Sequence, residues 1–227
     1  MNGKTFERNL PQGYKVDDVL YAEKGRFARM LTVLYIISLF IAIGLLYLPF
    51  LLDSNSVRLD VRVGEDRLPY YVVALVLTVA YVILHELAHG VVYKKRTGEK
   101  LTYGFALTCA YCGVPKIFTY RKTAIAAVLA PFIVFTLILI PALVACYFLH
   151  AGLYLALGIV FAMHLSGCSG DLYVAFLFAT KYKDNRTLMN DTGSKMAFFV
   201  PTDDEELDED TARFLEEKKA TETRRKR

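Results

Sequence analysis

Residues 68–93 read LPYYVVALVLTVAYVILHELAHGVVY. The run is apolar almost throughout, and Glu86 is its only charged residue. At a rise of about 1.5 Å per residue, a helix of this length crosses a hydrocarbon core roughly 30 Å thick. The stretch therefore predicts a transmembrane helix that carries a carboxylate inside the membrane.

Three other stretches have the same character. Residues 30–52 and 123–149 contain no charged side chain, and residues 151–180 contain only Asp171. Hydrophobic residues make up 55% of the 227-residue chain, and its mean hydropathy is +0.34. A soluble protein of this size has too small a core to bury four such helices. We therefore expect four transmembrane helices in a lipid bilayer.

The polar segments on either side of this apolar region divide the chain into three parts. Residues 1–29 form an N-terminal arm, residues 30–180 the transmembrane domain, and residues 181–227 a charged and partly disordered tail. The first apolar block begins too late for a cleaved signal peptide, so we expect that helix to be retained.

Basic side chains gather at one end of the predicted helices. They precede the first helix, follow the second and follow the fourth: Lys24, Arg26, Arg29, Lys94, Lys95, Arg96, Lys181 and Lys183. The positive-inside rule then predicts a multi-pass cell-membrane protein with both termini in the cytoplasm. Because topology accounts for the basic excess, we expect no nucleic-acid partner.

The segment between the second and third helices has another pattern. From residue 101 to residue 111 large and small side chains alternate, and this period of two predicts a β-strand. Gly113 and Pro115 mark a turn before a second extended segment at 116–120. The predicted fold class is therefore an all-α membrane protein with four transmembrane helices and a β-hairpin inserted between helices two and three.

The second predicted helix carries the motif His85-Glu86-Leu87-Ala88-His89. Residues four apart lie on one face of a helix, so the imidazoles of His85 and His89 can bind one metal ion. Glu86 lies about 100° round the helix from His85, within reach of a water held by that metal. The alternative is a chance match, but an acidic residue at mid-membrane costs about 2.5–3.5 kcal/mol. We therefore expect a metal site with Glu86 as the catalytic residue.

A catalytic zinc site usually has three protein ligands, and Asp171 is the strongest candidate for the third. It is the only charged residue besides Glu86 in the four apolar blocks. If both helices are upright, Asp171 and His89 differ in depth by only about 7 Å. The small residues at 166–170 let the two helices approach closely. The alternative role for Asp171 is that of a paired structural carboxylate.

Several other polar residues in the membrane region have more than one possible role. His164 lies two turns before Asp171 on the same helix face, and it can be a ligand, an oxyanion donor or a partner of a backbone carbonyl. We favour the last two roles, because its depth suits the substrate side better than coordination. Cys109 and Cys112 have the spacing of a zinc or redox pair, but we expect ordinary strand residues. Cys168 is expected to be a packing residue.

These motifs resemble those of a family of small prokaryotic membrane proteins described as zincin peptidases. The resemblance covers residues 70–180 and rests on H-E-L-A-H-G at 85–90, Y-G-F at 103–105, A-P at 130–131 and S-G-C-S-G-D at 166–171. It implies zinc binding by His85, His89 and Asp171, with Glu86 catalytic. The arrangement is also distantly similar to the site-2 intramembrane metalloproteases, whose third ligand is an aspartate on a later helix.

The sequence thus predicts a membrane-embedded zinc metallopeptidase that cleaves a membrane protein or peptide in or near the membrane. Zinc activates water, and Glu86 takes and returns a proton. We expect a water-accessible cavity that opens to the cytoplasmic side, and an edge of the hairpin that holds the substrate as an added strand. Two alternatives stay open: a zinc hydrolase of a non-protein substrate, and a catalytically inactive, metal-stabilised membrane adaptor.

Overall fold

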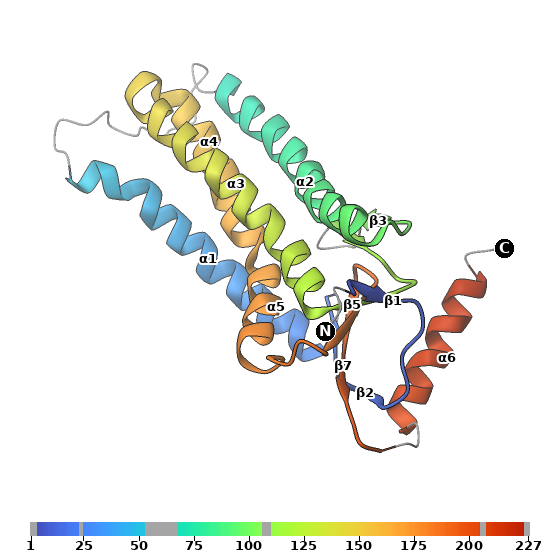
Figure 1. Ribbon diagram of the computed structural model, residues 1–227. Coiled ribbons are helices and arrows are strands. Elements are labelled where there is room, and N and C mark those ends of the chain that lie inside the picture. The colour runs from blue at the N-terminus through green and yellow to red at the C-terminus, as the bar shows by residue number, and fades with distance from the viewer. Residues whose placement is uncertain (1–3, 23–24, 53–67, 106–109, 205–207, 225–227) are drawn as a thin grey trace.

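The computed structural model describes residues 4–22, 25–52, 68–105, 110–204 and 208–224 (Figure 1). Long helices form a bundle, and a β-sheet lies against one end of it. The helices contain the apolar blocks of the sequence, whereas the sheet takes strands from the polar arm, the tail and the segment between the second and third long helices.

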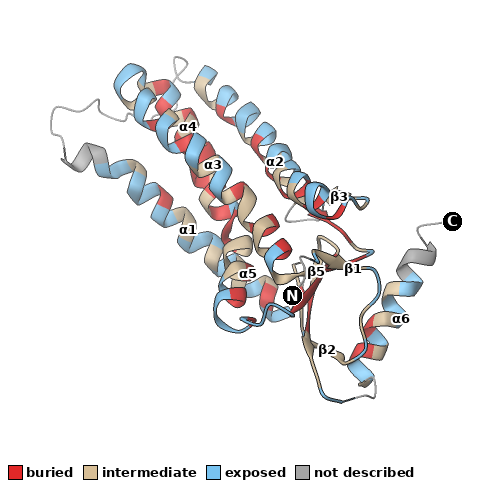
Figure 2. Cartoon of the chain, in the orientation of Figure 1, coloured by how far each residue is buried: buried red, intermediate tan, exposed pale blue. Residues whose placement is uncertain are grey.

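Four helical segments of the described chain are long and apolar enough to cross a membrane, as the sequence predicted. They are α1 (Gly25–Leu52), α2 (Leu68–Thr97), α3 (Arg121–Leu149), and a fourth segment made of α4 (Ala151–Gly167) and α5 (Ser169–Thr180). Their outer faces carry exposed apolar side chains (Figure 2), with Leu75 65%, Phe40 69% and Leu137 71% exposed. Such continuous apolar faces suit contact with lipid.

The helices do not all touch one another. α2 packs on α3 and α4, whereas α1 packs on α4 and α5. α1 and α2 therefore lie on different sides of α4, as the blue and green helices of Figure 1 show. The cavity described below is lined by both of these helices.

The fourth apolar segment is interrupted just before Asp171. The helix α4 ends at Gly167 and α5 begins at Ser169, with Cys168 between them at φ −74° and ψ −4°. The break falls in the run of small residues that the sequence shows here, and it places Asp171 in the first turn of α5. A carboxylate is favoured there, because the N–H groups of a helix N-terminus carry partial positive charge.

A five-stranded antiparallel sheet corrects the predicted fold class, which was all-α. Within the described residues its order is β1 (Phe6–Glu7), β5 (Phe118–Tyr120), β6 (Leu188–Asp191), β7 (Lys195–Pro201) and β2 (Tyr14–Tyr21). The sheet buries Phe118, Phe198 and Phe199 almost completely, at 1%, 0% and 0% exposure. Each strand alone is short, and strands far apart in the chain become stable only when they pair and bury these aromatic rings together.

The hairpin between α2 and α3 exists, but its strands differ from the predicted ones. β3 (Thr102–Phe105) pairs with β4 (Ala110–Gly113), so the predicted single strand from 101 to 111 reverses direction within itself. The second predicted strand, 116–120, contains β5 and joins the other sheet. The alternation of large and small residues continues through the reversal, so the period alone could not locate it.

The hairpin lies tightly against α2. Gly90 has no side chain, and a Cβ there would collide with the hydroxyl of Tyr103 on β3. Gly113 at the end of β4 likewise lies against the backbone of Gly193, where a Cβ would also collide. These two close approaches hold the hairpin between the membrane helix and the turn after β6.

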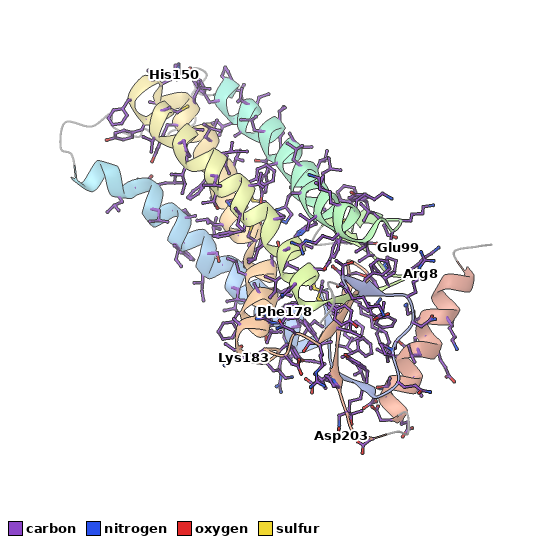
Figure 3. The ribbon with its side chains drawn as sticks, in the orientation of Figure 1. Arg8, Glu99, His150, Phe178, Lys183 and Asp203 are labelled. Atoms are coloured by element: carbon purple, nitrogen blue, oxygen red, sulfur yellow. The ribbon has the colours of Figure 1, made fainter. Side chains whose placement is uncertain are left out.

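Polar contacts fasten the arm and tail to the same end of the bundle. The guanidinium of Arg121 donates to the backbone oxygens of Phe178 and Tyr182, at the C-terminal end of α5. Helix α6 (Glu209–Arg224) packs on the sheet through Phe214, which is 6% exposed. Figure 3 shows Arg8, Glu99 and Asp203 at this end, and His150 at the other.

One ionic contact joins the N-terminal arm directly to the end of α5. The carboxylate of Asp17 on β2 accepts hydrogen bonds from Lys181 and from the hydroxyl of Tyr182, each at 2.7 Å. Partial burial acts to raise the pKa of Asp17, but the two hydrogen bonds and the positive charges of Lys181 and Lys15 together outweigh it and hold the pKa below its ordinary value.

We expect Asp17→Asn to lower the free energy of unfolding by about 1 kcal/mol at neutral pH. A lowered pKa in the folded state means that the stabilisation is present above the ordinary Asp pKa of about 3.9 and is lost as the pH falls through the folded value. Thermal melting of the purified protein against pH tests this, and parent and variant should converge in acid. Asp210→Asn, at an exposed pair with Arg213, is the control. A difference that persists at the lowest pH would contradict the prediction.

Candidate metal centre

The two histidines of the motif lie on the inward face of α2. His85 and His89 are 8% and 7% exposed, and their Nε2 atoms are 3.2 Å apart. The same face of the helix carries the buried residues Tyr81 and Tyr93, one turn before His85 and one turn after His89. The four-residue spacing therefore brings both imidazoles to one point inside the bundle, as the sequence predicted.

Asp171 comes to the same point from α5. Its Oδ2 atom lies 3.3 Å from Nε2 of His85 and 3.5 Å from Nε2 of His89. The three residues form the group of side chains in the described chain that can hold a metal ion. The structure thus brings together the three residues that the sequence singled out as ligands.

The spacing of these three atoms fits a tetrahedral ion. Zinc bound at about 2.0–2.2 Å by nitrogen and oxygen places its ligand atoms about 3.4 Å apart. The observed separations are 3.2, 3.3 and 3.5 Å. In addition, Asp171 Oδ2 is buried without a hydrogen-bond partner among the residues that the structure describes. A buried carboxylate oxygen without a partner is costly, and a cation at this point would remove that cost.

The far side of each imidazole is also occupied. Nδ1 of His89 lies 2.8 Å from the backbone oxygen of Ala127, and Nδ1 of His85 lies 2.9 Å from the hydroxyl of Tyr81. A carbonyl can only accept, so Nδ1 of His89 carries the proton and its Nε2 presents a lone pair to the cluster. Two imidazoles and one carboxylate form a ligand set that zinc accepts.

Glu86 lies beside this cluster on the wall of a cavity of about 600 Å³. His85, His89 and Asp171 line the same cavity, and so does Arg29 of α1. The Glu86 carboxylate is partly buried and makes no hydrogen bond to any other residue in the described ranges. A cavity of this volume is in the range of small-molecule and peptide-side-chain sites.

The sheet and the hairpin also contribute to the cavity wall. Ala110, Tyr111 and Cys112 line it from β4, Asp191 lines it from the end of β6, and Gly193 lines it from the turn that follows. The metal ligands therefore come from the membrane helices, whereas part of the surrounding wall comes from the strands.

Asp191 is a residue of this wall that the sequence analysis missed. It is 5% exposed, and it accepts hydrogen bonds from the Tyr93 hydroxyl at 2.6 Å and from the Gly193 N–H at 2.8 Å. Its burial raises the pKa of the carboxyl above the ordinary value. Tyr93 lies one turn after His89, so this contact ties the metal-binding end of α2 to the sheet. Nothing in the local sequence links these two distant residues.

The contacts of His164 differ from those expected, whereas Cys112 and Cys168 are buried, as expected of a strand residue and a packing residue. His164 is fully buried, and its nitrogens lie 3.0 Å from the Tyr81 hydroxyl and 2.9 Å from the Thr136 hydroxyl, with no bond to a backbone carbonyl among its described contacts. Cys112 is buried in the cavity wall, whereas Cys109 lies outside the described residues. Cys168 is fully buried at the α4–α5 break.

Comparison with known proteins finds a family match over the segment that contains the metal cluster. Residues 78–185 match the model of a family described as "Putative zincin peptidase", which confirms the resemblance seen in the motifs. The matched segment contains the two histidines, Glu86 and Asp171. No curated protein and no solved structure matches the chain. The similarity to site-2 proteases stays a prediction.

We expect His85→Ala, His89→Ala and Asp171→Ala each to weaken zinc binding by more than about 100-fold. This loss is larger than the one typical of residues that only hydrogen-bond to a ligand. Competition with a chelator, on protein purified in detergent, measures this. Cys112→Ser changes a neighbouring cavity residue and should keep the parental affinity. Parental zinc affinity in folded Asp171→Ala would remove Asp171 as the third ligand.

Proposed function

We propose that this chain, whose residues 78–185 match the zincin peptidase family, is a membrane-embedded zinc metallopeptidase that hydrolyses peptide bonds in or near the membrane. The observation that supports this most is the convergence of His85, His89 and Asp171 to within 3.5 Å, inside helices apolar enough to cross a membrane. Glu86 shares the cavity wall with them.

The side chains divide the work of peptide hydrolysis between them. A zinc ion, when bound, polarises a water and a substrate carbonyl and lowers the pKa of the water from 15.7 to about 7. Glu86 is placed to accept a proton from water in the cavity, because its carboxylate is free of hydrogen bonds within the described chain. The same carboxyl group then returns the proton to the leaving amine.

The substrate is proposed to bind as an added strand beside β4. Peptidases bind extended backbone, and an unpaired strand edge supplies hydrogen bonds for it. In the described chain β4 pairs with β3 alone, and its residues Ala110, Tyr111 and Cys112 line the cavity that contains Glu86. A segment lying along this edge therefore passes close to the catalytic carboxylate.

Glu86 also weighs against the non-catalytic alternative. An adaptor that keeps zinc only for stability has no use for a carboxylate without hydrogen-bond partners next to its ligands. Such a carboxylate inside a membrane helix is energetically unfavourable, and in an adaptor nothing would offset that penalty. The open position of Glu86 therefore favours an enzyme.

The arm, the sheet and the tail are proposed to lie in the cytoplasm. The structure places the arm, the hairpin and the tail at one end of the bundle (Figure 1), and the basic residues Lys94, Lys95, Arg96 and Lys181 lie at that end. The positive-inside rule assigns such an end to the cytoplasm. The metal cluster then lies in the cytoplasmic half of the membrane, since His89 is only two turns from the end of α2.

This orientation predicts the outcome of reporter insertions. A reporter after Arg227 or near Gly98 should respond as cytoplasmic, and one near Ser56 as external. Paired fusions, one active only in the cytoplasm and one active only outside it, measure each position. An external signal at Gly98 would invert the assignment and move the metal site to the other leaflet.

The catalytic role of Glu86 predicts a separation of metal binding from turnover. Glu86→Gln keeps the size of the side chain and removes the base, so the variant should bind zinc like the parent. Cleavage should fall by about 10²–10⁴-fold, the usual loss for general acid–base catalysis. The measurement is the appearance of new peptide N-termini when purified protein is mixed with detergent-solubilised membrane proteins.

The matched control is Glu99→Gln, at a surface carboxylate paired with Arg8. It should cleave at the parental rate. If Glu86→Gln also cleaves at that rate, Glu86 is not the base and the proposed mechanism is wrong. If the parent and both variants bind zinc but none of them cleaves a membrane protein, the result supports the non-catalytic adaptor alternative.

A further inference from the structure

A line of polar side chains, buried at Tyr81 and His164 and half-buried at Thr136, runs from His85 away from the metal cluster. The hydroxyl of Tyr81 lies 2.9 Å from His85 Nδ1 and 3.0 Å from His164 Nδ1. The other ring nitrogen of His164, Nε2, lies 2.9 Å from the hydroxyl of Thr136. The line therefore crosses three helices, from α2 to α4 and on to α3. Tyr81 and His85 line the same cavity as Glu86, but the line has no part in the proton transfers proposed above.

Aromatic rings hold these polar groups in place. Tyr81 and Phe135 meet edge to face at 5.1 Å, and His164 stacks on Phe132 at 5.9 Å with 17° between the ring planes. Tyr81 is 6% exposed and His164 is 0% exposed. Rings packed in this way keep these partners, so the hydrogen bonds of the line depend on where each proton sits. Cys168 Sγ is a further, weaker partner, 4.0 Å from the Tyr81 hydroxyl and 3.6 Å from His164 Nδ1.

The two cluster histidines differ in what lies behind them. His89 faces a backbone oxygen, which only accepts, so its Nδ1 must donate. His85 faces the Tyr81 hydroxyl, which both donates and accepts. His85 can therefore carry its proton on either nitrogen, provided that Tyr81 and His164 change direction with it.

Two arrangements of the protons use only the short contacts of this line, whereas a third would need Tyr81 to donate to Cys168 Sγ over 4.0 Å. With a metal on His85 Nε2, the proton is on Nδ1 and is donated to Tyr81. Tyr81 then donates to His164 Nδ1, and His164 donates from Nε2 to Thr136. Without a metal, His85 Nε2–H donates to His89 Nε2 at 3.2 Å, and Tyr81 donates to His85. His164 then donates from Nδ1 to Tyr81, and Thr136 donates to His164. Each group carries one proton in both arrangements, so the number of protons is conserved.

We infer that Tyr81, His164 and Thr136 are positioning residues for the metal site, which keep His85 hydrogen-bonded in both arrangements and move the His164 proton from Nδ1 to Nε2 when metal binds. They favour metal binding because a hydrogen bond to the non-coordinating nitrogen of His85 fixes the orientation of the ring and raises its basicity. The inference rests on the proposed metal site and not on peptidase turnover. The positioning role and the peptidase activity can therefore fail independently.

The first test is zinc affinity. Tyr81→Phe removes the hydroxyl and leaves the ring, and it should weaken zinc binding by about 10–100-fold in chelator competition. Tyr154→Phe is the matched control, because it also removes a buried tyrosine hydroxyl, one that donates to the backbone oxygen of Leu46 at 2.8 Å. The control should lower the melting temperature and keep the parental zinc affinity. Parental affinity in folded Tyr81→Phe overturns the positioning role.

A second pair of variants tests the positioning role if Tyr81→Phe does not fold. Thr136→Val removes the hydroxyl at the far end of the line and keeps the shape of the side chain, whereas Thr136→Ser keeps the hydroxyl. Weaker zinc binding in Thr136→Val, restored in Thr136→Ser, supports the inference. Equal zinc affinity in the two variants contradicts it, because a merely structural threonine would change stability alone.

The second test reads the protons directly. The chain has only 4 histidines, so selective ¹⁵N-histidine labelling gives few ring signals, and a His164→Gln variant assigns those of His164. Nitrogen chemical shifts should show His164 protonated on Nδ1 in metal-free protein and on Nε2 in zinc-loaded protein. His150, at the other end of the bundle (Figure 3), should not change between the two states. An unchanged His164 tautomer on zinc binding overturns the proton rearrangement.

Discussion

Hydrocarbon offers no hydrogen bonds, so a polar side chain inside a membrane-spanning helix must find its partner within the protein. The metal centre depends on this constraint. His89 is paired with the backbone of α3 and His85 with Tyr81, so both imidazoles are held with their Nε2 atoms facing Asp171. These contacts need α2, α3 and α5 at fixed distances, and the constraint on a few polar atoms therefore sets the arrangement of the bundle.

The parts of the fold that follow from local pattern could be predicted from the sequence. Long apolar blocks predicted the four membrane helices, and the i, i+4 spacing predicted the meeting of His85 and His89. Asp171 could be singled out because charged residues are so rare in those blocks. The five-stranded sheet could not be predicted, since its strands are short and come from both polar ends and a loop. Tyr81 was missed for another reason: a tyrosine in an apolar helix does not reveal its hydrogen bonds.

The sheet does more than cover one end of the helices. Its turn at Asp191 to Gly193 lies in the cavity wall, and the hydrogen bond from Tyr93 joins that turn to α2 one turn beyond His89. Arg121 joins the start of α3 to the end of α5, the helix that carries Asp171. Both helices that supply ligands are thus fastened at the same end by strand and loop residues. The polar regions of the chain contribute to the precision of a site that they do not themselves form.

The pairing of β2 with β7 has a consequence for the order of events during biosynthesis. Tyr14 lies opposite Pro201 in that ladder, so β2 has no partner strand until β7 has been synthesised. Asp171 likewise follows His85 by several helices, and the ligand set is incomplete while only the first three spans are inserted. A translation product that stops before Asp171 therefore lacks one of the three residues of the metal site.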